Sequence, residues 1–429
     1  NYIRERCEGW EEYEESLRFF TPERVEALSG IPQENLYRAA RLFATGGRAA
    51  IYFGMGITQH SHGVDNVKAC ANLSLITGNL GFEGGGINPL RGHSNVQGAC
   101  DMGALPDVFS GYQKVTDEAV RRKFAQAWGI DPHRLDPETG LTATRMVEQC
   151  GDPIKVLYIM GENPLMADPN LNQVEEQFKK LDFLIVQEIF LTETARMADV
   201  VLPGVAFAEK TGTYTNTERR VQLSRSALEP PPGARQDYRI IAQLAERLGG
   251  KNFPDTPEAL FDEIRALTPS YHGMSYARIE GEGLRWPCPE ADHPGTPILY
   301  MGQFARGKGR LSALVYRPPA EEPDEAYPLR LSTGRMLQHF HTGSLTRRAQ
   351  VLDGLVPHGQ VEIHPRDAAR SGVESGERIR VRTRRGFIDT YAYVTERVAE
   401  GSLFIPFHFA EAAANRLTND VLDPVSNIP

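Results

Sequence analysis

The chain has 429 residues, of which 41% are hydrophobic and 24% are charged, and its formal net charge is −9. This length suggests two to four domains. The negative balance argues against nucleic acid as a partner, and without a run of eighteen apolar residues no membrane insertion is expected.

The cysteines give no sign of a structural framework. They are Cys7, Cys70, Cys100, Cys150 and Cys288. Their number is odd and no two form a CxxC pair, so neither a disulfide framework nor a complete iron–sulfur motif is expected from them. The first residue is Asn1 and no apolar signal core follows it, so we expect the chain to begin inside a longer gene product.

The first part of the chain predicts half of an α/β domain. Residues 1–48 read as polar helices, with a cap signal at Thr21-Pro22. A short buried strand over 49–53 ends in a glycine turn, and a helix is predicted over 64–77. Strand, glycine turn and helix in succession are typical of an α/β fold. The glycine-rich residues 81–111 are weakly periodic, and we expect them to be irregular and functional.

The second part predicts a parallel sheet. Its strands are expected over 155–160, 183–187 and 199–202, and its helices over 170–181 and 239–248. Strands that alternate with helices favour a parallel arrangement. Ligands of such a sheet bind beyond the carboxyl ends of its strands, here near Gly161 and Gln187.

The last part changes character. Residues 250–325 are rich in Pro and Gly, and short strands follow at 328–332, 360–363, 377–383, 387–394 and 401–405. Their spacing suggests a small β-barrel. The predicted fold class is therefore α/β, with parallel-sheet, dinucleotide-binding-like domains before a C-terminal β-barrel. The expected domains are 1–93 (latter half of one α/β domain), 94–249 (a second α/β domain), 250–325 (a small inserted or linking region) and 326–429 (the barrel).

The segment 88–106 concentrates polar groups and glycines in one loop. Arg91 is able to hold a small carboxylate through a two-pronged contact, and His93 is able to pass a proton near neutral pH. A surface arginine and a packed histidine are the ordinary alternative, and composition alone favours it.

The run RGHSNVQGACDMGALP, residues 91–106, resembles the active-site loop of formate dehydrogenases in the molybdopterin oxidoreductase family. The resemblance extends over nearly the whole chain through GMGITQH, TGNLG, MGENP, VQEIFLTETARMADVVLP, TNTERRVQ and GRMLQHFHTGSLTRR. It implies that Arg91 faces the metal and engages formate. The position of His93 is His in some members and Gln in others, so we rank it below Arg91 as a catalytic residue.

The resemblance also implies the cofactor, two molybdopterin guanine dinucleotides around one Mo or W. Gly54 and Gly56 suit a close approach of phosphate because they lack a Cβ, although most such pairs are ordinary turns. The turn Gly161-Glu162-Asn163 matches the guanosine-binding loop of the family. The remaining cofactor contacts expected in these segments are Met55, Gln59 and Asn95.

Asp237 is a candidate for guanine recognition, because a carboxylate is able to accept both N1–H and N2–H of guanine. The alternative is an N-cap for the helix that begins near Arg239, and both roles are compatible. The resemblance favours guanine. Gln187 and Glu188 end a predicted strand, where ribose hydroxyls are expected.

The segment 335–343 holds one arginine and two histidines. If it is a strand, His339 and His341 share a face. Zinc would need further ligands, and we expect no metal ligand from this chain. By resemblance the region clamps the pterins and phosphates and Asn415 lies near a pterin. The predicted contacts are Thr333, Gly334, Arg335, His339, His341, Thr342, Gly343 and Asn415.

We therefore expect the large subunit of a molybdenum or tungsten formate dehydrogenase, which interconverts formate and CO2. The family's [4Fe-4S] cluster, the Cys or selenocysteine on the metal and a coupling lysine belong to a segment expected before Asn1. The isolated chain is accordingly predicted to be inactive. Expected partners are electron-transfer subunits with iron–sulfur clusters, linked to NAD or a hydrogenase, in the cytoplasm.

Two alternatives stay open. A different family member, such as a nitrate reductase, would share the cofactor but not the loop at 91–106. A non-catalytic electron-transfer or structural homologue should have lost the cofactor contacts, whereas Arg91, Asp237, Arg335 and His339 are all present.

Overall fold

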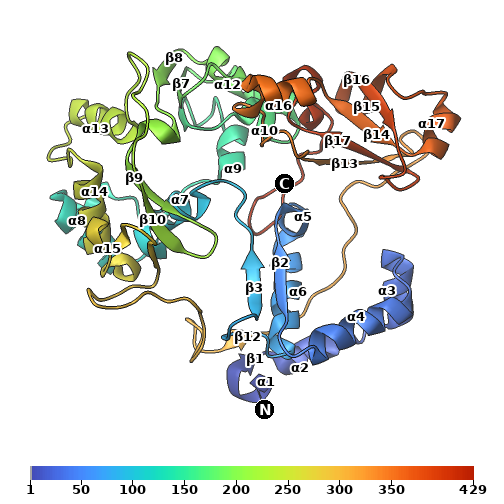
Figure 1. Ribbon diagram of the computed structural model, residues 1–429, viewed down its shortest axis with the longest axis horizontal. Coiled ribbons are helices and arrows are strands. Elements are labelled where there is room, and N and C mark those ends of the chain that lie inside the picture. Colours follow the sequence, from blue (N-terminus) through green and yellow to red (C-terminus); the bar gives the residue numbers. More distant parts are fainter. Residues whose placement is uncertain (1) are drawn as a thin grey trace.

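The computed structural model describes residues 2–429. In Figure 1 the N-terminal helices and the β2–β3 pair stand at the bottom, and the C-terminal sheet lies at the upper right. The parallel sheet with β7 and β8 lies at the top, and the β9–β10 hairpin lies to the left. This mixed α/β architecture confirms the predicted fold class.

The N-terminal part is helical, as predicted. Its helices are α1 (Tyr2–Arg6), α2 (Trp10–Leu17), α3 (Pro22–Ser29) and α4 (Gln33–Thr45). The Thr21 hydroxyl accepts a hydrogen bond from the Arg24 N–H at 3.3 Å and caps α3. Strand β2 (Ala50–Phe53) leads into α5 (Met55–Thr58) and α6 (Gly63–Ile76). The predicted strand, turn and helix are therefore present.

The glycine-rich stretch 81–111 is more regular than expected. Strand β3 (Gly86–Pro89) pairs in parallel with β2, and α7 (Val96–Asp101) follows. The prediction of an irregular segment was wrong here, because backbone pairing with β2 supplies order that the side-chain pattern does not reveal. Two short strands, β4 (Val108–Phe109) and β5 (Gln113–Lys114), then form a hairpin.

The predicted parallel sheet is confirmed. It has the order β6–β7–β8, with strands Val156–Met160, Phe183–Glu188 and Val200–Pro203. Its helices are α9 (Ala143–Glu148), α10 (Pro164–Ala167), α11 (Leu171–Phe178) and α12 (Glu193–Met197). The Gly161 N–H donates to the Gln187 carbonyl at 2.9 Å, so both residues lie at the carboxyl edge.

A further lobe surrounds a hairpin that the sequence patterns did not reveal. Strands β9 (Gly212–Thr215), β10 (Arg220–Ser224) and β11 (Leu284–Arg285) form an antiparallel sheet. Its helices are α8 (Glu118–Trp128), α13 (Asp237–Arg247), α14 (Pro257–Leu267) and α15 (Tyr276–Ile279). Its core includes Val221, Phe261 and Tyr271.

The expected domain ranges stay a prediction, but the packing shows how residues 250–325 are used. Phe261 and Cys288 join the core around β10. Phe304 and Leu311 instead join the N-terminal core, where β12 (Gly309–Arg310) pairs with β1 (Cys7–Glu8). This region therefore ties two lobes together.

The C-terminal part is a curled, half-barrel sheet with the order β13–β17–β14–β16–β15. Its strands are β13 (Arg330–Gly334), β14 (Gln360–Ile363), β15 (Arg378–Thr383), β16 (Gly386–Val394) and β17 (Ser402–Pro406). Each lies within two residues of its predicted place. Helices α16 (Gln350–Leu355) and α17 (Pro365–Ser371) flank it. The core is formed by apolar residues such as Val361, Ile405 and Phe409.

Short 3-10 helices complete the fold at Ser110–Tyr112, Pro132–Arg134, Phe207–Glu209, Pro269–Tyr271, Thr346–Arg348, Ala410–Ala412 and Ala414–Arg416. Within residues 2–429, no helix combines the length and the apolar character needed to cross a bilayer.

Candidate functional site

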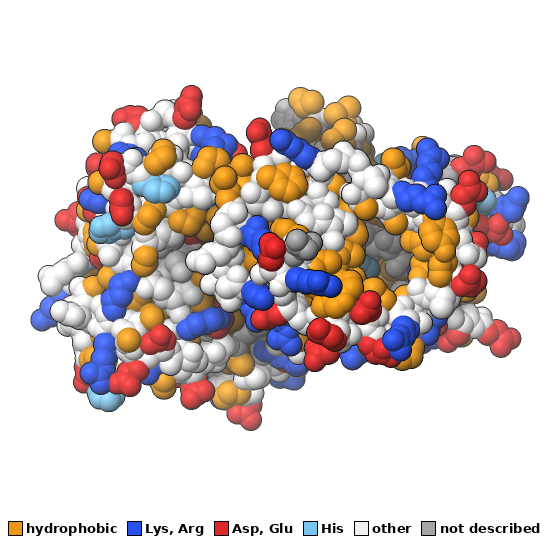
Figure 2. All heavy atoms as spheres, turned by 90° about the horizontal axis from the view of Figure 1, so that it is seen from below, with side chains coloured by type: hydrophobic (Ala, Val, Ile, Leu, Met, Phe, Trp, Pro, Cys, Tyr) orange, Lys and Arg blue, Asp and Glu red, His pale blue; other side chains and the backbone are white. Residues whose placement is uncertain are grey.

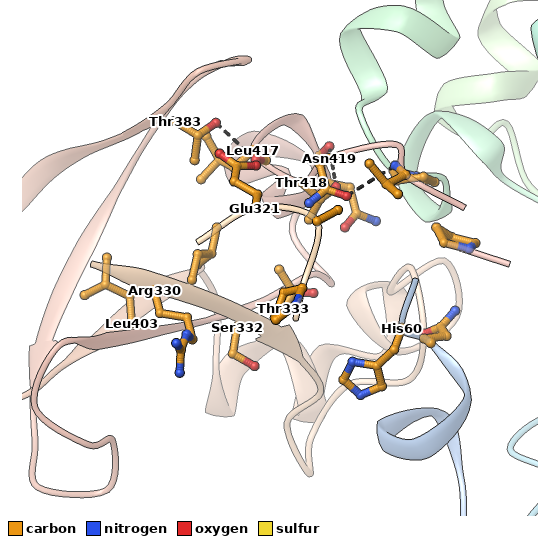
Figure 3. A pocket seen from close by; sticks show the side chains of 18 of the residues that line it. His60, Glu321, Arg330, Ser332, Thr333, Thr383, Leu403, Leu417, Thr418 and Asn419 are labelled. Carbon is orange, nitrogen blue, oxygen red and sulfur yellow. Dashed lines mark hydrogen bonds between the residues drawn. The ribbon is translucent and has the colours of Figure 1, made fainter. Parts of the chain in front are cut away.

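A large cleft separates α5 from the half-barrel. Its volume is about 1790 Å³, more than the roughly 300–1,000 Å³ of ordinary small-molecule sites. Figure 3 shows Ser332 and Thr333 of β13 along its floor, with His60 near α5 on one side. Nine predicted cofactor residues line it: Met55, Gly56, Gln59, Glu162, Thr333, Gly334, Arg335, His341 and Asn415.

The glycine turn before α5 is open toward its surroundings. A Cβ built on Gly54 or Gly56 meets no heavy atom within 4 Å, so packing within the protein does not require glycine there. Between them, Met55 accepts a hydrogen bond on its Sδ from Arg335 Nη2 at 3.2 Å. The turn and the half-barrel therefore meet directly at the cleft, and the backbone of Gly56 is left accessible to a ligand.

Arg335 also connects the half-barrel to the loop that begins at Arg91. A Cβ built on Gly92 would lie 3.3 Å from Arg335 Nη1. Beside this contact, the rings of His93 and His341 meet edge to face, with centroids 4.4 Å apart. Phe340 packs against His93 on the same side, with the ring centroids 5.1 Å apart. Among the described residues, Arg335 forms no salt bridge, so its charge is available to an anion.

Burial and neighbouring charge keep both histidines neutral near pH 7. Burial, then the Arg335 guanidinium, lowers the pKa of His93 below its ordinary value. Burial, then the nearby His93 and Arg335, lowers the pKa of His341 to about 4. A neutral imidazole is able to accept a proton, so this pair suits proton transfer.

The segment 335–343 is not a strand, and this separates its two histidines. Strand β13 ends at Gly334, and His341 has a φ of 47°. The buried His339 ring contacts the Val356 carbonyl at 2.8 Å and the Thr346 hydroxyl at 3.2 Å, inside the half-barrel. The condition for a shared face, a strand over both residues, is therefore not met, because turns point His339 inward and His341 into the cleft.

The end of this segment is fixed by packing. A Cβ on Gly343 would come within 2.6 Å of the His408 carbonyl, and its φ is +76°, so glycine is required. The Thr342 and Ser344 hydroxyls are 2.9 Å apart. His408 Nε2 accepts from the Met336 N–H at 3.0 Å, and Nδ1 therefore donates to the His341 carbonyl. These bonds set the position of His341.

Arg91 is exposed, and its side chain is held at one point. Its Nε donates to Gln97 Oε1 at 3.2 Å, and its backbone N–H donates to the Thr217 hydroxyl at 3.1 Å. Within the described part of the chain its guanidinium forms no ion pair. Asn95 accepts from the Thr215 N–H at 2.9 Å, which ties the loop to β9.

Asp237 is the first residue of α13 and lies at the carboxyl edge of β7, and its side chain makes no capping hydrogen bond. Its carboxylate accepts from Gln187 Nε2 at 2.7 Å and pairs with Lys210, and Tyr158 donates to Gln187. Helix α13 has Gln236 as its N-cap residue, with no side-chain capping bond. The alternative reading of Asp237 as a simple helix cap is therefore wrong. Its carboxylate belongs to a polar cluster at the strand ends.

Two other predicted residues of this edge are held by the protein itself. The Asn163 carboxamide donates to Glu193 at 2.8 Å and accepts from the Thr194 hydroxyl at 2.7 Å, so its side chain is fully engaged. Glu188 accepts from the Ile189 N–H at 2.7 Å, and burial raises its pKa. Gly161 has a φ of +66° and open space beside its Cα, so a ligand is able to approach its backbone.

The pKa values of two carboxyl groups in the cleft, those of Asp168 and Glu162, are raised. Burial, together with the charge of Glu162, raises the pKa of Asp168 to about 7. Burial likewise raises the pKa of Glu162. Asn415 donates to the carbonyls of Met166 and Ala167, both at 3.0 Å, and joins α10 to the half-barrel. The raised pKa values at these two positions weaken the repulsion that Asp168 and Glu162 exert on an anionic ligand.

Two family models match the chain. The molybdopterin oxidoreductase model matches residues 20–247, just over half of the chain. The chain belongs to the molybdopterin oxidoreductase family. Residues 329–429, which include the half-barrel, match the "Molydopterin dinucleotide binding domain". The open glycine turn, the free charge of Arg335 and the size of the cleft fit such a dinucleotide.

Curated relatives match over the entire chain. The alpha subunit of an F420-dependent formate dehydrogenase from Methanocaldococcus jannaschii is 48% identical over 100% of this chain and 63% of its own length. Formate dehydrogenase H of Escherichia coli is 36% identical over 100% of this chain and 61% of its own length. The chain therefore spans less than two thirds of these relatives. The structure of acetylene hydratase from Pelobacter acetylenicus aligns with a TM-score of 0.72 at 21% identity, covering 100% of this chain and 66% of that one, which supports the fold.

Several residues at the site escaped the sequence reasoning. Gln97 and Asp101 lie within the run 91–106, where their i, i+4 spacing on a helix is the signal that points to them. Lys210 carried no signal, because its partner Asp237 is 27 residues away. His408 was also missed, and only the tertiary structure places it under the segment 335–343.

Proposed function

We propose that this chain forms the formate- and cofactor-binding part of a molybdopterin guanine dinucleotide formate dehydrogenase, with Mo or W as the metal. The reaction converts formate into CO2, a proton and two electrons, or runs in reverse. The observation that carries the proposal is the guanidinium of Arg91. It is held at Nε and lacks a carboxylate partner among the described residues, and it lies two residues before His93, whose ring meets that of His341.

The chain's own residues are suited to hold the dinucleotides. The backbone at Gly54, Gly56 and Gly161 would receive phosphates, and Arg335 would supply a compensating charge. Asp237 would accept guanine N–H groups at the carboxyl edge of the parallel sheet, where dinucleotides bind in such folds. The bound cofactor would supply the two-electron acceptor.

Arg91 and His93 divide the remaining work. The Arg91 fork would hold the formate carboxylate in two charge-assisted hydrogen bonds and orient its C–H bond. As that bond breaks, an imidazole nitrogen of His93 would take the proton, and the electron pair would leave to the acceptor. His93 is suited to this role because its lowered pKa leaves it neutral at pH 7. Loss of the negative charge then releases CO2 from Arg91.

The proposal extends to partners and location. The relatives named above include an alpha subunit of an F420-dependent enzyme, which favours an assembly with further electron-carrying subunits. We propose subunits with iron–sulfur clusters, linked to NAD or a hydrogenase, and a [4Fe-4S] cluster in the intact large subunit. A cytoplasmic location belongs to the same proposal.

The test is Arg91→Ala in the intact enzyme that contains this chain, assayed by formate-dependent dye reduction. Charge-assisted bonds contribute about 1.5–3 kcal/mol, so kcat/KM should fall at least roughly tenfold with metal content unchanged. Arg122→Ala is the control, because it removes an exposed arginine that pairs only locally with Glu118 on α8. The proposal would be contradicted by a wild-type enzyme without formate-dependent dye reduction, or by an Arg91→Ala variant with near-normal kcat/KM.

A further inference from the structure

Beneath Arg91 lies a buried carboxylate that the proposed reaction does not use. Asp101 is 1% exposed, and Gln97, one helical turn before it on α7, is 7% exposed. Gln97 Nε2 donates to Asp101 Oδ1 at 2.8 Å, and Arg91 Nε donates to Gln97 Oε1 at 3.2 Å. A continuous path of hydrogen bonds therefore leads from the buried carboxylate to the guanidinium at the surface.

Asp101 gathers four hydrogen-bond donors. Besides Gln97, Oδ1 accepts from the Tyr112 hydroxyl at 2.8 Å. Oδ2 accepts from the Tyr271 hydroxyl at 2.6 Å and from the Trp286 indole N–H at 2.7 Å. The indole N–H is able only to donate, and the two tyrosine hydroxyls donate as well, so both carboxyl oxygens of Asp101 act as acceptors. Asp101 forms no salt bridge within residues 2–429.

This arrangement decides which way the Gln97 carboxamide points. Because Asp101 only accepts, the amide nitrogen of Gln97 must face it, and the amide oxygen must then face Arg91. A reversed amide would place its oxygen against the carboxylate and its N–H₂ against the guanidinium. Both contacts would be repulsive, so the buried charge selects one orientation.

We propose that Gln97, oriented by Asp101, is a positioning residue that fixes Arg91 through Nε and leaves both terminal nitrogens directed at formate. This inference rests on the proposed function. Trp286, Tyr271 and Tyr112 come from three separate segments, so the carboxylate is held by the packed lobe and not by the loop. The exposed Arg91 side chain is thereby held in place before formate binds, so it loses less conformational entropy when it binds a small anion.

The test is Gln97→Met in the intact enzyme, since methionine keeps the length of the side chain but loses its oxygen. We expect KM for formate to rise about tenfold, with a smaller change in kcat. Formate that binds the folded enzyme raises its melting temperature. The formate concentration that gives half of the maximal rise should increase by the same factor in the variant. If Gln97→Met does not fold, Gln97→Asn is used, because it keeps a carboxamide but falls one methylene short of Arg91.

The matched control is Asn72→Leu. Asn72 is a buried residue on α6 in the N-terminal part of the chain. Its carboxamide accepts from the Ser312 N–H at 2.9 Å and donates to the Ser312 carbonyl at 2.8 Å. The Asn72→Leu substitution should lower the melting temperature of the enzyme and leave KM for formate unchanged. A Gln97 variant that behaves like this control, with lower stability and unchanged KM, would overturn the inference.

A double-mutant cycle distinguishes positioning from general damage. In an Arg91→Lys background there is no Nε for Gln97 to hold, so Gln97→Met should change KM less than about twofold. Additive effects in the two backgrounds would show that Gln97 acts elsewhere. If the wild-type enzyme oxidises formate and Gln97→Met leaves KM for formate unchanged, only this inference is refuted. If the wild-type enzyme is inactive with formate, the proposed function itself is refuted.

Discussion

The rings of His93 and His341 meet at an interplanar angle of 72°, with centroids 4.4 Å apart. One residue comes from the loop after β3 and the other from the turn after β13, so the pair joins the first α/β region to the half-barrel at the cleft. Arg335 lies close to both rings and lowers both pKa values. The positive charge of Arg335 therefore acts on both rings of the pair.

The first prediction concerns the pH dependence of formate oxidation. Burial and Arg335 lower the pKa of His93 from its ordinary 6.5, so the ring stays neutral until the pH falls below that value. We expect kcat/KM to be level from about pH 8 to 6.5 and to decline only in more acidic solution. Arg335→Gln removes a positive neighbour and should move this decline to higher pH.

The measurement is kcat/KM against pH, normalised to the cofactor content of each preparation. His133→Gln, which alters an exposed histidine in the 3-10 helix after α8, is the control and should leave the profile unchanged. A wild-type decline centred above pH 6.5 would exclude His93 as the proton acceptor.

The second prediction concerns Asp237. Asp237→Ala should reduce retention of the guanine dinucleotide, because it removes the proposed acceptor for guanine and leaves Lys210 and Gln187 without their partner. Asp117→Ala is the control, since Asp117 does cap a helix and accepts from the Ala119 N–H at 2.8 Å. That control should lose about 1 kcal/mol of stability and keep its cofactor. Normal guanine and pterin content in Asp237→Ala would refute the assignment.

The third prediction concerns Asp168, whose pKa is raised from 3.8 to about 7. The folded chain binds this proton more tightly than the unfolded chain, so ionisation of Asp168 lowers the free energy of unfolding. This loss of stability is absent below pH 3.8, grows between pH 3.8 and about 7, and is complete above pH 7. Asp168→Asn should therefore stabilise the cofactor-free chain at pH 8. Because the side chain is partly exposed, the expected gain is about 1–2 kcal/mol.

Urea unfolding at pH 8 and pH 5 checks this prediction, and the gain should be clearly smaller at pH 5. Equal gains at the two pH values would mean that the charge of Asp168 is not the cause. Asp136→Asn, an exposed aspartate in a loop, should change the stability at neither pH.

The fourth prediction separates the two histidines after β13. His339→Ala should destabilise the half-barrel by about 2–3 kcal/mol, because it leaves a cavity and an unpaired Val356 carbonyl. His341→Ala should cost less than about 1 kcal/mol, because its ring faces the cleft. Urea unfolding of the purified chain measures both, and a His341 variant at least as unstable as the His339 variant would reverse the assignment.

Local patterns were enough to find the main strands. The apolar run at 183–187 matches β7, and the alternation of polar and apolar residues at 360–363 matches β14, because a strand buried on one or both faces leaves such a signal in a few consecutive residues. The hairpin of β9 and β10 has a weaker signal, because its strands have only four and five residues and Val221 and Leu223 are their only aliphatic side chains, so pairing with each other orders them.

The sequence by itself determined the family resemblance, the α/β organisation with a C-terminal β-barrel-like domain, and Arg91, His93, Asp237 and Arg335 as candidate residues. Only the tertiary structure decided that His339 turns inward while His341 turns outward, that Asp237 pairs with Lys210, and that Asp101 supports Arg91 through Gln97. The reason is physical. A motif specifies residue types along the chain, whereas burial, hydrogen-bond partners and pKa values arise from atoms that distant segments bring together.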